Sequence, residues 1–259
     1  MKNKQLDLDL GLEPILNTGS NLVEVDQFAG MGSEGVEIQD LIIPFLRIAQ
    51  PLSPQVTEDN STTKAGDFTN SATLENYGKE IRVLVVGTSK VYNHWRDVEK
   101  GGGFLGSFST DDPVVLETLK KGFQGAKQWI DDETYLAETF NFALIITSHN
   151  NASTILALTS SGIKSARKWL TFMMLQKNPA EKTKAFFHRE YILTTFKENK
   201  KVGAQTQTWY TPVFKPAELL SDASLVNKCV EFNKFFASYK PKMADDVAEV
   251  ANVEEDIDF

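Results

Sequence analysis

The 259-residue chain has a single cysteine, Cys229, and only three histidines, His94, His149 and His188. One cysteine excludes an internal disulfide and a zinc site built from several cysteines, and it suits a reducing compartment. No histidine has a Cys, Asp or Glu partner at ligand spacing, so we expect no metal site. The chain also lacks a glycine-rich phosphate loop and a Gly-x-Ser-x-Gly motif. We therefore expect no cofactor and no enzymatic activity.

Long apolar runs are missing as well. No stretch approaches the roughly 18 apolar residues that a membrane helix needs. The N-terminal segment MKNKQLDLDLGLEP has two lysines but no apolar stretch after them, so it does not look like a secretory signal peptide. Apolar residues make up 41 % and charged residues 24 % of the chain, which is typical of a globular protein. A cytoplasmic protein is expected.

Basic residues are in the minority, and the net charge of −8 argues at first against contact with nucleic acid. The distribution of charge changes that conclusion. Residues 1–40 contain two basic and eight acidic residues, and residues 241–259 contain one basic and seven acidic residues. Residues 160–215 contain eleven basic residues and three acidic ones. A basic segment between two acidic ends is the informative signal for a polyanionic partner.

Composition divides the chain into three parts. Residues 1–39 are polar and acidic and are predicted to form a flexible arm, residues 40–240 the folded body, and residues 241–259 a disordered acidic tail.

Strands are predicted from short apolar runs bounded by turn residues. The best strand covers 79–95, and hairpins are predicted over 134–160 and 185–216. Pro44 and Pro51 prevent a helix in the apolar run 40–52, which is therefore expected to be extended.

Helices are predicted at 112–123, at 162–176 and at 216–239. Asp112 is expected to cap the first of these, with Pro113 at its first position. Residues 64–78 and the glycine-rich segment 99–110 are predicted loops. A helix set between two hairpins favours a mainly β (α+β) fold close to the OB-fold, a five-stranded antiparallel barrel, although other α+β arrangements fit the same pattern.

Aromatic and basic residues are interleaved in KVYNHWR (90–96), KSARKWL (164–170) and TWYTPVFK (208–215). Single-stranded nucleic acid is bound by this combination, because cations contact phosphates and flat rings stack on bases. The four rings in the predicted contact set lie at strand ends or beside turns, so they are expected to be accessible. Trp169 lies next to the apolar face of its helix and is expected in the core instead. The predicted contact residues are Tyr92, Trp95, Arg96, Lys164, Arg167, Lys168, Arg189, Lys197, Lys200, Lys201, Trp209 and Tyr210.

The chain ends in EEDIDF, which places four carboxylates and a bare phenylalanine at the C-terminus. This tail resembles the tail tips of bacterial single-stranded DNA-binding proteins and of the single-stranded DNA-binding proteins of tailed phages. The body resembles the phage group more closely. The segments that carry this resemblance are DLIIPFLRIAQPLSPQV, AGDF, SGIKSARKWL, YILTTFKEN and WYTPVF. The chain is longer than the bacterial proteins and has no Gln/Gly/Pro-rich linker before its tail.

The resemblance implies an OB-fold body that binds single-stranded DNA without sequence preference in replication and recombination. It also implies a location in the host cytoplasm and a possible homo-oligomer. It further implies that the tail recruits replication proteins such as a polymerase, helicase or primase. The tail residues that would bind such a partner are Glu254, Glu255, Asp256, Ile257, Asp258 and Phe259.

Three alternatives stay open on the sequence. A phage virion-associated structural protein would use its acidic ends only for solubility. A recombination annealing protein would need the same basic groove. A metal-dependent nuclease would use Asp131, Asp132 and Glu133.

Overall fold

The computed structural model describes residues 35, 43–59, 61–122, 127–202 and 205–238. By its internal contacts the chain divides into two units, Met1–Leu41 and Ile42–Phe259, and the described helices and strands belong to the second. Apart from Gly35, the predicted arm lies outside the described residues, as does the predicted acidic tail.

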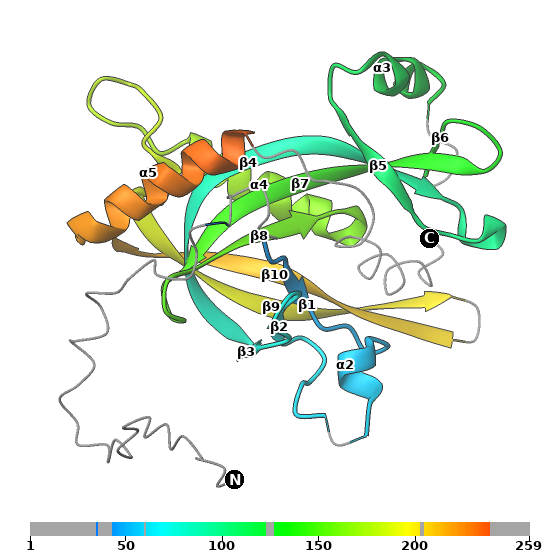
Figure 1. Cartoon of the computed structure of the whole chain (residues 1–259), viewed down its shortest axis with the longest axis horizontal. Coiled ribbons are helices and arrows are strands. Elements are labelled where there is room, and N and C mark those ends of the chain that lie inside the picture. The colour runs from blue at the N-terminus through cyan, green and yellow to red at the C-terminus, as the bar shows by residue number, and fades with distance from the viewer. Residues whose placement is uncertain (1–34, 36–42, 60, 123–126, 203–204, 239–259) are drawn as a thin grey trace, which may run out of the picture. The chain divides into compact units, whose positions relative to one another are not determined.

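The described part is mainly β with helices inserted between strands, as the sequence predicted (Figure 1). The strands are β1 (Leu46–Ile48), β2 (Phe68–Asn70), β3 (Asn76–Gly78), β4 (Glu80–Arg96), β5 (Phe104–Ser109), β6 (Gln128–Trp129), β7 (Thr134–Ile146), β8 (Ala152–Leu158), β9 (Arg189–Val202) and β10 (Gln205–Leu219). The helices are α2 (Pro54–Thr57), α3 (Pro113–Lys120), α4 (Ile163–Met174) and α5 (Ala223–Ser238), with short 3-10 turns η3 (Val98–Lys100), η4 (Ser160–Gly162) and η5 (Phe186–His188).

The strands form two antiparallel sheets. The large sheet has the order β10-β9-β4-β7-β6, with β5 also paired to β4 and β8 also paired to β7. The small sheet has the order β1-β2-β3, and a single parallel bridge between Phe45 and Ile155 brings its start next to β8. Within the described residues these sheets stay open and do not close into the five-stranded barrel that the sequence favoured.

Strand β4 is the central strand of the large sheet. Its first residues, Glu80–Leu84, pair with β9, and its last residues, Val91–Trp95, pair with β5. Its other edge pairs with β7 from Val83 to Arg96, with a bulge between Val85 and Gly87. The long strand therefore connects two ends of the sheet that carry different neighbours.

The large sheet buries apolar residues on both faces, because side chains alternate along each strand. One face, here called the α4 face, includes Val83, Phe142 and Leu193 and is covered by α4 and the small sheet. The opposite face, the α5 face, includes Leu84 and Ile145 and is covered by α5.

Trp169 of α4 lies in the core, as predicted, with 2 % of its surface exposed. Its ring stacks on Phe142, with 4.8 Å between ring centroids, and on Phe214, with 5.5 Å. These contacts join α4 to both β7 and β10.

Several predicted elements are confirmed. The strand 79–95 is β4, the hairpin 134–160 is β7 and β8, and the helix 162–176 is α4. The predicted cap of α3 is present, because the carboxylate of Asp112 accepts a hydrogen bond of 2.9 Å from the N–H of Val114.

Three predictions are wrong, each because strand pairing overrides the local pattern. Residues 216–219, predicted helical, continue β10 because Leu219 pairs with Arg189 on β9. The predicted loop 99–110 contains β5, which pairs with β4, and its glycines 101–103, all at positive φ, precede that strand. The predicted loop 64–78 contains β2 and β3.

Candidate nucleic-acid interface

Strands β9 and β10 extend beyond the rest of the sheet as a two-stranded ribbon (Figure 1). Pairing of β9 with β4 stops at Thr194, which faces the first residue of β4, Glu80. Pairing of β9 with β10 continues to Val202 and Gln205. We call residues 195–202 and 205–212 the ribbon.

The ribbon is rich in β-branched residues, and two side-chain bonds fix its register. The hydroxyl of Thr208 donates to Asn199 over 2.7 Å, and that of Thr211 donates to Glu198 over 2.7 Å. Pro212 on the outer strand removes a backbone donor from the open edge, which protects it against pairing with another chain.

Residues directly opposite each other in the ribbon lie on the same face of it. Lys197 faces Tyr210, and Lys201 faces Thr206. By alternation from Leu193, these pairs lie on the α4 face. Both lysines are exposed and Tyr210 is half-buried, so the predicted combination of cations and a ring is present here.

The other face of the ribbon carries Lys200, which is exposed, and Phe196, whose side chain is 60 % exposed. Phe196 was not among the predicted contact residues. The alternation of side chains along a strand could have identified it, because Tyr191 and Leu193 of the same strand are buried on one face and Phe196 lies on the other.

A second basic group lies on α4. The helix buries Ala166, Trp169 and Met173 against the α4 face. The cations on its outer side, all exposed, are Lys164, Arg167 and Lys168. Arg167 and Lys168 border an open surface pocket whose other walls are Thr171, Phe172 and Leu175.

The α4 cations and the ribbon belong to one side of the sheet. Trp169 and Ser165 of α4 line the same small cavity as Pro212 and Phe214, at the base of the ribbon. The structure thus brings together two of the predicted groups of contact residues, which are about 30 residues apart in the sequence.

One carboxylate lowers the positive charge of this surface. Glu138 of β7 binds the ammonium of Lys90 at 2.6 Å and the guanidinium of Arg167 at 2.7 Å. Burial raises the pKa of Glu138, but the hydrogen bonds from Lys90 and Arg167 outweigh that effect and leave the pKa below its usual value. Lys90 also lies over the rings of Tyr92 and Phe140, with 5.3 and 5.6 Å to their centroids.

The predicted accessibility of three rings is wrong. Tyr92, Trp95 and Trp209 expose only 6 %, 8 % and 8 % of their surfaces. Tyr92 packs with residues of α3, and Trp95 packs edge-on against Phe104 of β5 with 5.0 Å between centroids. Such rings are sealed by residues distant in sequence, and only Tyr210 of the four remains partly open.

Two predicted cations lie away from the ribbon. Arg96 is exposed but ends β4, at the opposite end of that strand from the ribbon. Arg189 begins β9 and is half-buried, eight residues before Lys197, which corresponds to about 26 Å along a strand.

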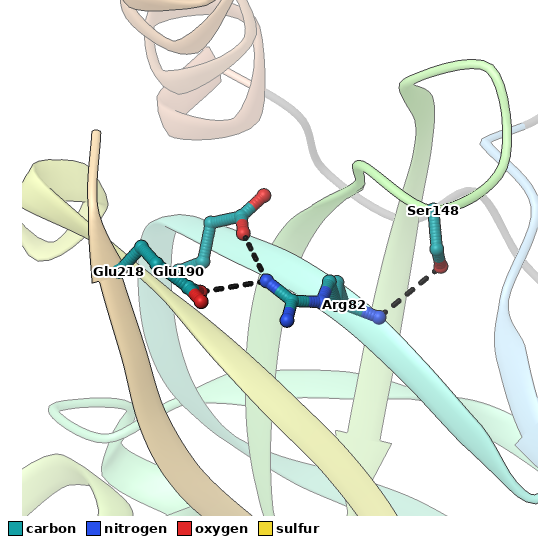
Figure 2. A network of polar contacts seen from close by, with 4 residues as sticks. All are labelled: Arg82, Ser148, Glu190 and Glu218. Atoms are coloured by element: carbon teal, nitrogen blue, oxygen red, sulfur yellow. Dashed lines mark hydrogen bonds and ion pairs between the residues drawn. The ribbon is translucent and has the colours of Figure 1, made fainter. Parts of the chain in front are cut away.

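The α5 face has a different electrostatic character (Figure 2). The guanidinium of Arg82 binds the carboxylates of Glu190 at 3.1 Å and Glu218 at 2.6 Å. Its backbone N–H donates to the hydroxyl of Ser148 over 3.1 Å. Two carboxylates thus surround one cation on β4, β9 and β10, and the local charge is negative.

The acids considered for a nuclease form part of a turn. Asp131 accepts hydrogen bonds from the N–H groups of Glu133 (2.9 Å) and Thr134 (2.7 Å), and the first of these is the main cause of its lowered pKa. In the part of the chain that the structure describes, no group of three or more His, Cys, Asp or Glu side chains could hold a metal ion. Nor does any helix of that part have the length and apolarity to cross a membrane.

Comparison with known proteins gives one match. The protein family described as "Pam3 phage gp34-like protein" matches residues 16–242. The chain belongs to this family. The match supports the phage origin that the sequence resemblance indicated, and the family description names no activity. No curated protein and no solved structure matches the chain.

Proposed function

We propose that this phage protein binds single-stranded DNA without sequence preference and protects it during replication or recombination. The observation that carries the proposal is the α4 face of the ribbon. There, exposed Lys197 lies opposite the half-buried ring of Tyr210 and exposed Lys201 lies further along the same strand, on the side of the sheet that also carries the exposed cations of α4. Cations that follow the phosphates and rings that stack on bases are the two requirements of sequence-tolerant binding.

The geometry favours a single strand over a duplex. The cations are spread along a ribbon and an adjoining helix, and α4 lies with its Trp169 side packed on the sheet instead of standing out as a helix that could enter a major groove. We retain the OB-fold as part of the proposal, since a long strand shared between two ends of a sheet is compatible with an opened barrel.

The acidic tail completes the proposal. Its sequence, from Glu254 to Phe259, combines carboxylates with an apolar end and suits short-motif recognition by a basic, apolar pocket on a replication protein. A homo-oligomer is compatible with the same function. The role would be stoichiometric in the host cytoplasm, with no bond made or broken.

Two matched double variants test the interface. Lys197→Gln with Lys201→Gln removes two charges from the α4 face of the ribbon. Lys215→Gln with Lys234→Gln removes two exposed charges that belong to β10 on the α5 face and to α5. Binding of labelled oligo(dT) is measured by anisotropy at several salt concentrations.

The ribbon variant should bind more weakly, and its salt slope should fall by about 1.4 because each phosphate contact on a single strand contributes about 0.7. The second variant should bind nearly as the unmodified protein does. Equal losses in the two variants would mean that net charge alone, and not this surface, drives binding. An annealing protein is distinguished by acceleration of the pairing of complementary strands, and a virion-associated structural protein by the absence of binding.

A further inference from the structure

The backbone of Tyr210 forms hydrogen bonds with the side-chain amide of Gln50, which occupies the place of a neighbouring strand. Its backbone N–H donates to Oε1 of Gln50 over 2.8 Å, and its carbonyl accepts from Nε2 of Gln50 over 3.1 Å. Gln50 itself is anchored, because its N–H donates to the hydroxyl of Ser53 over 2.8 Å. One amide side chain therefore satisfies both backbone groups of Tyr210 on the outer edge of β10.

The ring of Tyr210 is placed by a glycine. Gly66 has φ of +91°, and a Cβ added there would lie 2.6 and 2.7 Å from two ring carbons of Tyr210. The carbonyl of Gly66 accepts a hydrogen bond of 2.7 Å from Thr195, at the base of the ribbon. Only a residue without a side chain lets the ring lie this close to the backbone.

The surroundings of the ring are cationic. Lys197 is directly opposite Tyr210 on the same face of the ribbon, and Lys64 lies two residues before Gly66. Both lysines are exposed. The ring is thus supported on one side by backbone, partly open, and next to charges that suit a phosphate.

We propose that Tyr210 is a stacking position for one unpaired nucleotide, that Lys197 binds a phosphate beside it, and that Gln50 and Gly66 are positioning residues. This inference rests on the proposed function and assigns it to a place. The ligand class is a nucleobase of any identity within a single strand, because a ring face stacks on every base. The competing explanation is that Gln50 and Gly66 only attach the 49–67 segment to the ribbon.

Binding of labelled oligo(dT) by the full chain tests the stacking position. Tyr210→Leu should weaken binding about 5- to 150-fold, the range that corresponds to loss of one stacked base, while the salt slope stays unchanged because no charge is lost. Tyr210→Phe should keep the affinity. Lys197→Gln should lower the slope by about 0.7.

The positioning role has its own matched pair. Gly66→Ala and Gly78→Ala both place alanine at positive φ, but nothing lies within 4 Å of a Cβ at Gly78. Both variants should lose stability because of the positive φ, and Gly66→Ala should lose more because its Cβ also meets the ring. Only Gly66→Ala should lower the yield of photocrosslinking between 5-iodouracil in the oligonucleotide and Tyr210, mapped by mass spectrometry. Gln50→Glu, which removes the donor to the Tyr210 carbonyl, should lower the same yield.

The outcomes separate the two proposals. If the unmodified protein does not bind oligo(dT), both fail. If the unmodified protein binds, the stacking position is wrong in either of two cases: Tyr210→Leu binds equally well, or the crosslinks map elsewhere. Circular dichroism first confirms that Tyr210→Leu is folded, and in both cases the proposed function stands. If Gly66→Ala and Gly78→Ala crosslink alike, the positioning role of Gly66 is wrong.

Discussion

Replacing Glu138 with glutamine should strengthen binding of single-stranded DNA. The carboxylate holds Lys90 at 2.6 Å and Arg167 at 2.7 Å, so one negative charge offsets two positive ones on the α4 face. Glutamine keeps the size of the side chain and removes that charge. The variant surface then presents two positive charges to the phosphates, whereas the unmodified surface presents a net charge of one.

The magnitude follows from Coulomb's law. One charge removed about 8 Å from a phosphate changes the interaction by roughly 0.5–1 kcal/mol at effective dielectric constants of about 80 to 40. That corresponds to binding about two- to fivefold tighter at low salt. The cost to folding is small, about 0–1 kcal/mol, because Lys90 and Arg167 are substantially exposed and such ion pairs contribute little.

The assay is anisotropy of labelled oligo(dT) at low and at physiological salt, and the matched control is Glu190→Gln. Glu190 also binds an arginine, Arg82 at 3.1 Å, but on the α5 face (Figure 2). The control removes the same charge from the α5 face, on the opposite side of the sheet from the proposed DNA-binding surface. If Glu138→Gln binds no tighter than the unmodified protein, or if Glu190→Gln gains as much affinity, Glu138 does not weaken DNA binding on this surface.

Three further predictions follow from the same structure. Burial lowers the pKa of His94 and of His188, so the unfolded chain binds more protons than the folded chain. The free energy of unfolding should therefore fall as the pH drops from 7.5 to 5.5. A variant with both His94→Gln and His188→Gln should lose that pH dependence in urea denaturation. Trp169→Ala should lower the free energy of unfolding by about 3–5 kcal/mol because it leaves a cavity between α4 and the sheet, and an unchanged urea midpoint would contradict the packing. Truncation before Ala244 removes seven acidic residues and should tighten binding of oligo(dT) at low salt while abolishing capture of a replication protein; unchanged binding and capture would leave the tail without a role.

The elements that the sequence predicted correctly depend on local chemistry. Asp112 followed by Pro113 marks the start of α3, because a cap and a fixed φ act within one turn. The β7–β8 hairpin was predictable from the Asn-rich turn, and Asn150 and Asn151 indeed have φ of 49° and 53°.

The features that the sequence did not reveal depend on pairing between distant segments. Trp95 is sealed by Phe104 and Tyr135, which reach it only when β5 and β7 pair on both sides of β4. Residues 216–219 have a helical composition, yet pairing with the start of β9 keeps them extended.

The candidate site shows the same division. The cations of α4 and the ribbon were predictable from composition, because lysines and arginines are rarely buried. Gln50 and Gly66 carry no signal of their own, since a glutamine and a glycine in a loop are common. Their role depends on a ribbon that starts about 130 residues later.

Binding of single-stranded DNA is tested most directly by the affinity of the unmodified full-length protein for fluorescein-labelled oligo(dT), measured by anisotropy between low and high salt. Intrinsic tryptophan fluorescence is a poor substitute, because Trp95, Trp169 and Trp209 are buried. We expect saturable binding that weakens steeply with salt and little preference for base sequence. No binding at low salt would contradict the proposed function and favour a virion-associated structural protein.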